Sequence, residues 1–449
     1  MTGADRFGRR DFLTGTAGWL ASGVLGEAAA ACGLAPDQFI VASRKLPTPS
    51  VKLPTDRLPA PRGRKLRIVA LTTAWWKYSH ADDIITKFIE GYGVIGRTHL
   101  PHCKVVGLYV EQFPKSDISR GMAARYRIPM FKTPAEALTL GGEKLAADGV
   151  LLVGEHGDYP LNKKGQKLYP RWRLFEEIVK VFRKTGRSVP VFNDKHLSYS
   201  WKNAEWMHRQ SRELKFPMMA GSSVPVSWRR PPLAFRRGVP LNRALVAGSG
   251  SFESYGFHCL ELLQTFVEKR RGGETGVKGV QALEGAAADK VLDGDGWTSR
   301  LLPAAVASVP AARKNLNRKR RRRRVVFRIE YSDGFEAAVC LTGGMVSEYC
   351  FAAEVTGRSK PVATFAFLPK PQRDHFSFLC NHIEFMFRCG KPSYPVERTL
   401  LTTGLLDALH DSRAAGGKRM PTPHLRDVRY TPAEDVSAVR IKKIKGVNK

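Results

Sequence analysis

One stretch joins the pattern of a buried strand to three ionisable side chains: Val189-Pro-Val-Phe-Asn-Asp194-Lys195-His196. Ligands of open α/β sheets bind at the carboxyl ends of the strands, so Lys195 is expected where a bound molecule reacts. An apolar helix bearing His258 follows downstream, and a strand-end lysine facing a helix histidine suits proton transfer at a sugar-like carbon. Asp194 and Lys195 could equally form an exposed ion pair, since such pairs are common and contribute little.

Apolar runs alternate with segments of helical spacing on the N-terminal side of this stretch. The predicted strands are residues 66–71, 105–110, 149–153 and the strand that begins at residue 189. The predicted helices run from the capping box at Ser79 to Gly91 and over residues 121–126, 134–138 and 172–184. Strands and helices of these lengths form right-handed βαβ units with a parallel sheet. Residues 64–202 are therefore predicted to form a Rossmann-like domain.

The second half of the chain has a different pattern. Its predicted helices cover residues 203–214, 255–267, 375–388 and 397–412, and its predicted strands cover residues 216–222, 244–249, 277–283, 325–331, 335–341, 345–355 and 362–367. Ser332-Asp333-Gly334 predicts a hairpin turn. Consecutive strands of this kind predict an α+β domain over residues 203–417, used for substrate binding or oligomerisation, with a mostly antiparallel sheet. A basic tail, residues 418–449, would follow it.

The N-terminal segment has the features of an export signal. Arg9-Arg10-Asp11-Phe12-Leu13 precedes an apolar stretch rich in Gly and Ala that ends at Ala30, which is typical of a twin-arginine signal over residues 1–31. The stretch is too weakly apolar for a membrane-spanning helix. We therefore expect an exported protein, periplasmic or anchored at its N-terminus, that is not transmembrane after processing. Residues 32–63 are rich in Pro, Ser and basic residues and predict a linker.

The net charge of +32 is extreme for 449 residues, and part of it lies in Arg318-Lys-Arg-Arg-Arg-Arg-Arg324. Such a run repels itself, so it predicts a solvated loop, residues 313–324, inserted before a strand. An anionic envelope polymer is the partner that this loop would suit. Basic segments also bind nucleic acid through phosphates. No recognition motif accompanies the charge, however, and no specific nucleic acid is expected.

Metal sites are not expected from the sequence. The seven cysteines include no Cys-x-x-Cys pair, which argues against a zinc knuckle or a redox dithiol. His99 and His102 have close spacing but no second cluster of ligands. Asp293-Gly-Asp295-Gly resembles a calcium loop and lacks the remaining ligands.

The order of elements resembles the glucose-fructose oxidoreductase and inositol dehydrogenase superfamily, Gfo/Idh/MocA, over about residues 65–418. The motifs that carry the resemblance are Gly121-Met-Ala-Ala-Arg-Tyr-Arg-Ile-Pro129 with Pro134-Ala-Glu-Ala-Leu138, Ala147-Asp-Gly-Val-Leu-Leu-Val153, Asp194-Lys195-His196, Tyr255-Gly-Phe-His258 with Glu261, and Gly390-Lys-Pro392. Asp194-Lys195-His196 stands where the superfamily carries Glu-Lys-Pro, and Tyr255 to Glu261 is similar to its Asp-x-Gly-x-His-x-x-Asp. No single motif is specific, but their order is.

The resemblance implies that Lys195 and His258 line a substrate pocket, assisted by Asp194, while NAD or NADP accepts hydride. The chain departs from the superfamily in two carboxylates. Asp194 replaces a glutamate, and Ser254 stands where an aspartate is usual, so Glu253 would have to orient His258 in its place.

A larger departure lies after the first strand. The superfamily has Gly-x-Gly-x-x-Gly there, because glycines let the backbone approach a pyrophosphate. This chain has Thr72-Thr73-Ala-Trp75-Trp76-Lys77-Tyr78, with no glycine. A helix N-terminus and Lys77 could still attract a phosphate, so we expect Thr72, Thr73 and Lys77 beside the cofactor. Glu111, which ends the second strand, stands at the place of the ribose-binding acid.

Residues beyond the third strand are candidates for substrate contacts. His156 and Asp158 follow that strand in Glu155-His156-Gly157-Asp158-Tyr159 and would face the nicotinamide side of a superfamily-like pocket, although the segment could be an ordinary polar loop. Tyr255, close to His258, is the third candidate. The tryptophans near these positions would form a wall for a sugar or simply pack.

Three functions are consistent with these residues. The first is an NAD(P)-dependent oxidoreductase acting on a sugar or polyol, with cofactor loaded before export and with a homo-oligomer as its assembly. The second is the NAD-dependent glycosidase type known in the same superfamily. The third is a non-catalytic protein that binds carbohydrates or polyanions, in which Trp75 and Trp76 fill the cofactor groove. The missing glycines favour the third, and the retained lysine and histidine favour the first two.

Overall fold

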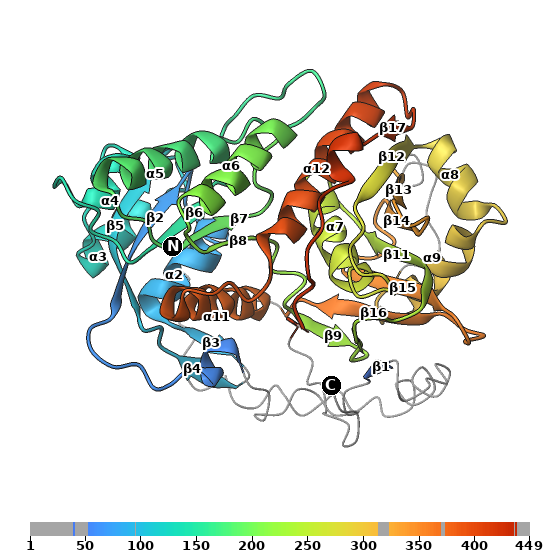
Figure 1. The fold of residues 1–449 in the computed structure, drawn as a ribbon, viewed down its shortest axis with the longest axis horizontal. Helices are drawn as coiled ribbons and strands as arrows, with labels where there is room; N and C mark the ends of the chain where they lie inside the picture. The colour runs from blue at the N-terminus through green and yellow to red at the C-terminus, as the bar shows by residue number, and fades with distance from the viewer. Residues whose placement is uncertain are drawn as a thin grey trace, which may run out of the picture.

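A computed structural model describes residues 39–40, 53–94, 96–312, 323–369, 373–434 and 436–437. The molecule has two domains, each built on one large sheet (Figure 1). The twin-arginine motif and Arg318 to Arg322 of the basic run lie outside the described residues. No described helix combines the length and the apolar character needed to cross a membrane.

The first domain contains a five-stranded parallel sheet in the order β5-β2-β6-β7-β8. Its strands are β2 (Leu66–Thr72), β5 (Cys103–Val110), β6 (Gly149–Val153), β7 (Val191–Asp194) and β8 (Met218–Gly221). Its helices are α2 (His80–Glu90), α3 (Ser119–Tyr126), α4 (Pro134–Thr139), α5 (Arg171–Thr185) and α6 (Trp201–Glu213). The predicted parallel Rossmann-like sheet is thus confirmed, but the predicted boundary at residue 202 is wrong, because α6 and β8, assigned to the second domain, complete the first. β5 lies on one side of β2 and β6 on the other, so the strand order reverses at β2.

Helices cover both faces of this sheet, which explains why its strands are continuous apolar runs. Successive side chains of a strand point to opposite faces. Ile68 and Ala70 belong to a core cluster with α2, while Val69 and Leu71 belong to a cluster with α4, α5 and α6. Ser79 caps α2 by accepting a hydrogen bond from the Asp82 N–H, as its spacing predicts.

The second domain contains an eight-stranded sheet in the order β17-β12-β13-β14-β11-β15-β16-β9. Its strands are β9 (Trp228–Arg230), β11 (Leu241–Gly248), β12 (Val277–Glu284), β13 (Val325–Tyr331), β14 (Glu336–Leu341), β15 (Tyr349–Val355), β16 (Val362–Phe367) and β17 (Met420–Pro421). The predicted antiparallel character is confirmed for every pair except β11 and β14, which are parallel. The predicted turn at Ser332 to Gly334 joins β13 to β14, with Gly334 at φ +84°.

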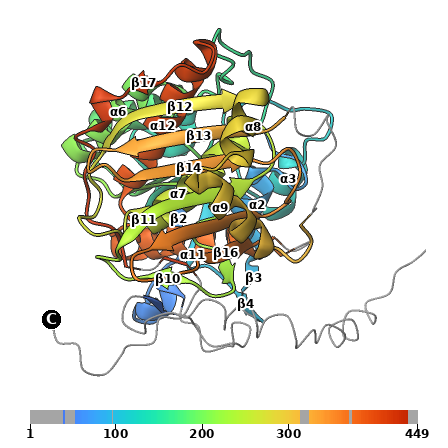
Figure 2. The same cartoon turned by 90° about the vertical axis from the view of Figure 1, so that its right-hand side faces the viewer.

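Helices pack against both faces of this second sheet. One face carries α7 (Ser254–Val267) and α12 (Val396–Ala414), and the other carries α8 (Ala286–Asp293) and α9 (Trp297–Ala307). Figure 2 shows α8 and α9 in front of the sheet. Neither of these two helices was expected, because their glycine-flanked, alanine-rich segments and the internal Pro303 weaken the helical pattern. α12 contacts α6 and β8 of the first domain as well as α7 and β12 of the second.

Helix α11 (Asp374–Cys389) follows the second-domain strands in sequence but packs into the first domain. Phe376, Leu379, Ile383 and Phe387 share a core cluster with α2 and the sheet. A Cβ atom on Gly149 of β6 would lie 3.0 Å from the Phe387 ring, so helix and strand are in close contact there. This domain is therefore completed by a distant part of the chain (Figure 1).

Short elements complete the fold. They are β1 (Phe39–Ile40) paired with β10 (Ala234–Phe235), the 3-10 turns η1 (Pro54–Arg57) and η2 (Pro423–Leu425), and the hairpin β3 (Tyr92–Val94) with β4 (Arg97–His99). Within the predicted linker, Leu53 and Thr55 are buried, and the Thr55 N–H donates to Asn381 of α11. Arg324, at the end of the predicted basic loop, pairs with Asp289 and Asp293 of α8.

Replacing Phe387 with Ala should destabilise the protein by about 3–5 kcal/mol, because it leaves a cavity between α11 and β6. The free energy of unfolding in urea measures this loss. The matched control is Leu100→Ala, whose side chain is 69% exposed and whose loss should change stability by less than about 0.5 kcal/mol. Equal stability of the two variants would contradict the proposed packing of α11.

Candidate active site

Lys195 follows the last residue of β7, at the carboxyl edge of the parallel sheet. Its backbone has φ +67°, and its N–H donates to the Gly221 carbonyl at 3.0 Å. His156 beyond β6 and Tyr78 beyond β2 also have positive φ, at +75° and +66°. Side chains other than glycine rarely adopt this region, and such strain is concentrated at functional sites. The sheet edge thus holds three strained residues.

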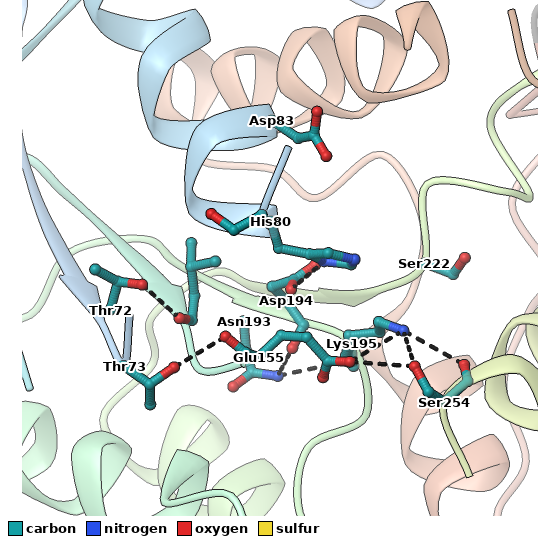
Figure 3. Close-up of polar contacts among 12 residues, drawn as sticks. Thr72, Thr73, His80, Asp83, Glu155, Asn193, Asp194, Lys195, Ser222 and Ser254 are labelled. Atoms are coloured by element: carbon teal, nitrogen blue, oxygen red, sulfur yellow. Dashed lines mark hydrogen bonds and ion pairs between the residues drawn. The ribbon is translucent and has the colours of Figure 1, made fainter. Parts of the chain in front are cut away.

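Lys195 meets His258 of the second domain. The Lys195 Nζ atom lies 2.8 Å from His258 Nε2, 3.1 Å from Ser254 Oγ and 3.3 Å from the Ser254 carbonyl oxygen. Figure 3 shows the lysine side chain between Glu155 and Ser254. Lys195 is 1% exposed and His258 is 9% exposed, so both are buried where the two domains meet. The sequence placed these two side chains opposite each other, and the structure brings them into contact.

Ser222, beyond β8, orients the His258 ring. His258 Nδ1 lies 2.6 Å from Ser222 Oγ, which also accepts the Val224 N–H. Burial first, and then the Lys195 charge, hold the His258 pKa well below its usual value, so the ring is neutral. In this neutral ring Nδ1–H donates to Ser222 and Nε2 accepts from the lysine. Glu253, the only substitute that the sequence offered for the missing aspartate, does not orient His258, because it contacts His196 and the Lys167 N–H instead.

Glu155 is the carboxylate nearest to this pair. It lies 3.4 Å from Lys195 Nζ, accepts the Ser254 hydroxyl at 3.2 Å, and forms an ion pair with Arg171 at the start of α5. Burial opposes its ionisation, but Lys195 and Arg171 outweigh burial and hold the Glu155 pKa well below its usual value. The site therefore contains a buried carboxylate between two cations.

The buried polar network extends on both sides of Lys195. Arg171 Nη1 lies 3.0 Å from His196 Nε2, and burial followed by the Arg171 charge lowers the His196 pKa to about 4. Asp194 Oδ2 lies 2.7 Å from Nδ1 of His80, the first residue of α2. Asp194 therefore contacts an α2 histidine, and no contact between Asp194 and Lys195 Nζ is found among the described residues.

The segment at the end of β2 forms hydrogen bonds to the segments that follow both neighbouring strands, β5 and β6. The Thr72 hydroxyl donates to the Val153 carbonyl and the Thr73 hydroxyl to the Glu155 carbonyl, both at 2.9 Å. The Trp75 side chain is fully buried, and its carbonyl accepts the Ile118 N–H. This segment thus links the ends of β5 and β6 across the point where the strand order reverses.

The remaining predicted residues lie at the edge of the site or outside it. Glu111 is engaged by Arg173 at 2.5 Å and by Tyr159 at 3.1 Å, and the exposed Lys77 pairs with Asp82 at 3.3 Å. Asp158 is exposed, and both its N–H and its carbonyl bond to the Gln112 side chain. Tyr255 is 45% exposed, with its ring centroid 6.4 Å from that of His258.

His156 lies between His80 and Trp76, with ring centroids 5.3 Å and 4.8 Å away. Burial, and next the charge of His80, lower the His156 pKa to about 4, and its Nε2 is buried without a hydrogen-bond partner in the described part of the chain. His156 therefore lies beside His80 and Trp76 at the carboxyl edge of the sheet.

The residues after β2 do not fit a dinucleotide bound at a glycine turn. The pyrophosphate of such a cofactor lies against the N-terminus of the first helix. Here Ser79 caps that terminus, Asp82 accepts the Tyr78 N–H, and Asp82 and Asp83 bring carboxyl groups into the first turn. Trp75 adds buried side-chain bulk where the superfamily has glycine. The Asp82 carboxylate and the Trp75 indole therefore oppose a phosphate in that pose, whereas Asp83 pairs with Arg373 and burial raises its pKa to about 7.

No group of three or more His, Cys, Asp or Glu side chains among the described residues is arranged to hold a metal ion. His99 Nε2 lies 2.6 Å from Glu384 of α11, and the His102 N–H donates to the same carboxylate. These two residues tie the β3–β4 hairpin to α11.

Three site residues were not predicted from the sequence: His80, Arg171 and Ser222. No role was predicted for Glu155 or Ser254. His80 was part of a capping motif, and Ser222 ended a predicted strand. Each stands within two residues of the carboxyl end of a strand or the first turn of a helix. That position is the signal that could have identified them.

No family model and no curated protein matches the chain, whereas solved structures do. A probable dehydrogenase from Thermotoga maritima is 11% identical, with 80% of this chain and 100% of that chain covered and a TM-score of 0.47. GenD2 from gentamicin A biosynthesis, in complex with NAD, is 13% identical over 81% and 99%, with a TM-score of 0.49. The WlbA dehydrogenase from Bordetella pertussis, in complex with NADH and UDP-GlcNAcA, is 15% identical over 80% and 99%, with a TM-score of 0.46.

Replacing Lys195 with Met should raise the pKa of His258, because it removes the positive charge next to Nε2. Titration of the ring resonances by NMR measures this change. Lys180→Met removes an exposed lysine on α5 that pairs with Glu176 and Glu177, and should leave the His258 pKa unchanged. An unaltered pKa in the Lys195 variant would contradict the contact.

Proposed function

We propose that this chain acts on a sugar or polyol and that Lys195 and His258 move the proton of a substrate hydroxyl. The observation that carries the proposal is the 2.8 Å contact between Lys195 Nζ and His258 Nε2, made by buried residues of different domains. General acid–base catalysis needs such groups within hydrogen-bond reach of the reacting atom. A hydroxyl entering beside this pair meets one donor and one acceptor.

The hydrogen-bond donors and acceptors around this pair suit a substrate hydroxyl group. The Lys195 ammonium donates to the neutral His258 ring, and Glu155 and Ser254 hold the ammonium from its other side. A substrate oxygen that replaces one of these acceptors receives the lysine hydrogen bond, and His258 Nε2 then accepts the substrate proton. Ser222 keeps the ring in the tautomer that this step needs.

The resemblance to the Gfo/Idh/MocA superfamily suggests that this proton transfer accompanies hydride transfer to NAD or NADP, so oxidoreduction is the first candidate reaction. Such a cofactor would accept or supply the hydride. The segment after β2 opposes its pyrophosphate in the usual pose, and the oxidoreductase proposal therefore requires another mode of binding. A glycosidase that cycles hydride internally has the same requirement.

A non-catalytic carbohydrate-binding protein is the second candidate. The burial of Trp75 in the core cluster with α2 and the bond from the Ile118 N–H to its carbonyl favour it, because the segment that stands in place of the glycine turn is packed into the protein interior.

For either candidate we also propose export by the twin-arginine route, assembly into a homo-oligomer, and binding of an anionic polymer by the basic run Arg318 to Arg323, since Arg324 is buried and pairs with Asp289 and Asp293. The export and polymer proposals rest on the sequence motif and the charge.

Mass spectrometry of denatured, natively exported protein separates the two candidates. The oxidoreductase proposal predicts NAD(H) or NADP(H) released in an amount close to that of the protein. Protein refolded without nucleotide is the control for adventitious carry-over. Absence of nucleotide from the native protein would overturn both redox functions and leave the second candidate.

Lys195→Ala and His258→Ala should each lower turnover of a sugar or polyol substrate by about 100-fold or more, because each removes one partner of the proton transfer. Turnover is measured with a panel of sugars and polyols, both as nicotinamide absorbance and as solvent deuterium incorporated into the product. Near-UV circular dichroism checks the fold, and Lys180→Ala is the control. Retained turnover in either site variant would show that the chemistry occurs elsewhere.

A further inference from the structure

A cavity of about 380 Å³ lies where η1 and the last described residues of the chain meet helix α11. Phe378, His382 and Phe385 line it from one side of that helix, and the turn after α11 and residues 433–437 complete its wall. None of the described residues that contact Lys195 lines this cavity. It is therefore separate from the candidate active site.

The C-terminal segment at this cavity connects the two domains. The ammonium group of Lys269, which follows α7 in the second domain, donates to the Ala433 carbonyl. Val436 packs into the core cluster of the first domain, and its carbonyl accepts a hydrogen bond from His382 of α11. Ligand sites are often found at such junctions between domains.

Two buried polar atoms on the cavity wall lack a partner. His382 is 6% exposed, and burial lowers its pKa to about 3, so its ring is neutral. Its Nε2 lies 3.1 Å from the Val436 carbonyl oxygen, which can only accept, so the ring hydrogen is on Nε2 and Nδ1 is an acceptor. Nδ1 and Ser393 Oγ have no hydrogen bond within the described residues. Because unpaired buried polar atoms are costly, they indicate a ligand that presents a donor to Nδ1.

The charged residues on the cavity wall favour an anion. Arg57 and Lys391 carry positive charges, and Glu434 is the one acidic side chain among the described lining residues. All three are exposed, and no ion pair between them is found in the described part of the chain. After burial, the charges of Arg57 and the buried Arg398 also hold the His382 pKa down, so the positive charge acts inside the cavity. An anionic group is therefore attracted to the solvent side of the cavity.

Most of the remaining wall is apolar. Leu53, Val226, Phe378 and Val436 are buried there, and Phe385 is partly buried. The volume is at the lower end of the range of about 300–1,000 Å³ that is typical of small-molecule sites. Apolar surface buried against such a wall contributes about 25 cal/mol per Å². The wall thus suits an apolar body about as large as one or two rings.

We propose that this cavity binds a small carboxylic acid with an apolar body and a hydroxyl group. The hydroxyl group donates to His382 Nδ1, and the carboxylate lies near Arg57 and Lys391 on the solvent side. The bound acid contacts both α11 and the C-terminal segment, so its binding stabilises the junction between the domains. The site is distinct from the Lys195–His258 pair and does not depend on the proposed function.

Binding is tested on the full-length protein by calorimetry, with 4-hydroxybenzoate and 4-hydroxycinnamate as probes. At least one hydroxy acid should bind, and it should raise the midpoint of thermal unfolding as its concentration increases. Benzoate and cinnamate, which lack the hydroxyl group, should bind about tenfold more weakly or worse, because His382 Nδ1 then stays unpaired. The uncharged 4-hydroxybenzamide should bind about threefold more weakly than 4-hydroxybenzoate, a smaller loss because exposed charges are screened.

Two variants locate the site. His382→Phe removes the acceptor, so each hydroxy acid and its parent acid should bind within about twofold of each other. Lys391→Met, in an exposed turn that leaves the core intact, should weaken the acids and leave the amide unchanged. Lys180→Met on α5 is the matched control, and Lys195→Met should bind as the unmodified protein does.

Three results would overturn this proposal. They are failure of both hydroxy acids to bind, equally tight binding of the parent acids, and acid affinity unchanged in Lys391→Met. Loss of binding in Lys195→Met would place the acid at the candidate active site and would overturn it as well.

Discussion

The structure depends on a buried ammonium group shared by two domains. Lys195 leaves the first sheet with its backbone in the left-handed region, and its charge is surrounded by Glu155, Ser254 and His258. Buried charges are costly unless geometry and hydrogen bonds compensate for the loss of water, and removing one partner leaves the other uncompensated. The same contacts that satisfy this charge also hold α7 against the edge of the first sheet. They therefore fix how the two domains are placed relative to each other.

The elements of the fold could be predicted well where apolar periodicity was strong. The strands that end at Thr72, Val110 and Val153 are continuous apolar runs, and α7 and α11 have apolar residues through most of their length. The helix that carries Pro303 was missed, because a proline and neighbouring small residues conceal a segment that tertiary packing makes helical. The low helical propensity of this segment is outweighed by its packing against a face of the second sheet that would otherwise be uncovered.

The candidate site could be predicted in part. The meeting of Lys195 and His258 was expected, since one ends a strand and the other belongs to the apolar helix that the resemblance aligned with a histidine motif. The side chains that form hydrogen bonds with the site residues could not be identified from their spacing in the sequence. Ser222 lies 36 residues from His258 and Arg171 lies 25 residues from His196, and these pairs arise only when neighbouring strands end at one edge. Whether Glu253 could replace the missing aspartate could not be decided from the sequence, because sequence adjacency does not determine which way a residue at a helix start points.

The packing of α11 has a consequence for biosynthesis. A ribosome makes residues 64–221, which contain every strand of the five-stranded sheet, well before it makes Phe376 to Phe387. Until that segment emerges, one face of the nascent sheet lacks the apolar cover that α11 provides. Domains usually fold as units during synthesis, starting with the N-terminal one. In this chain the first unit can reach its final form only after nearly nine-tenths of translation is complete, and the half-covered intermediate is the species that a chaperone would bind.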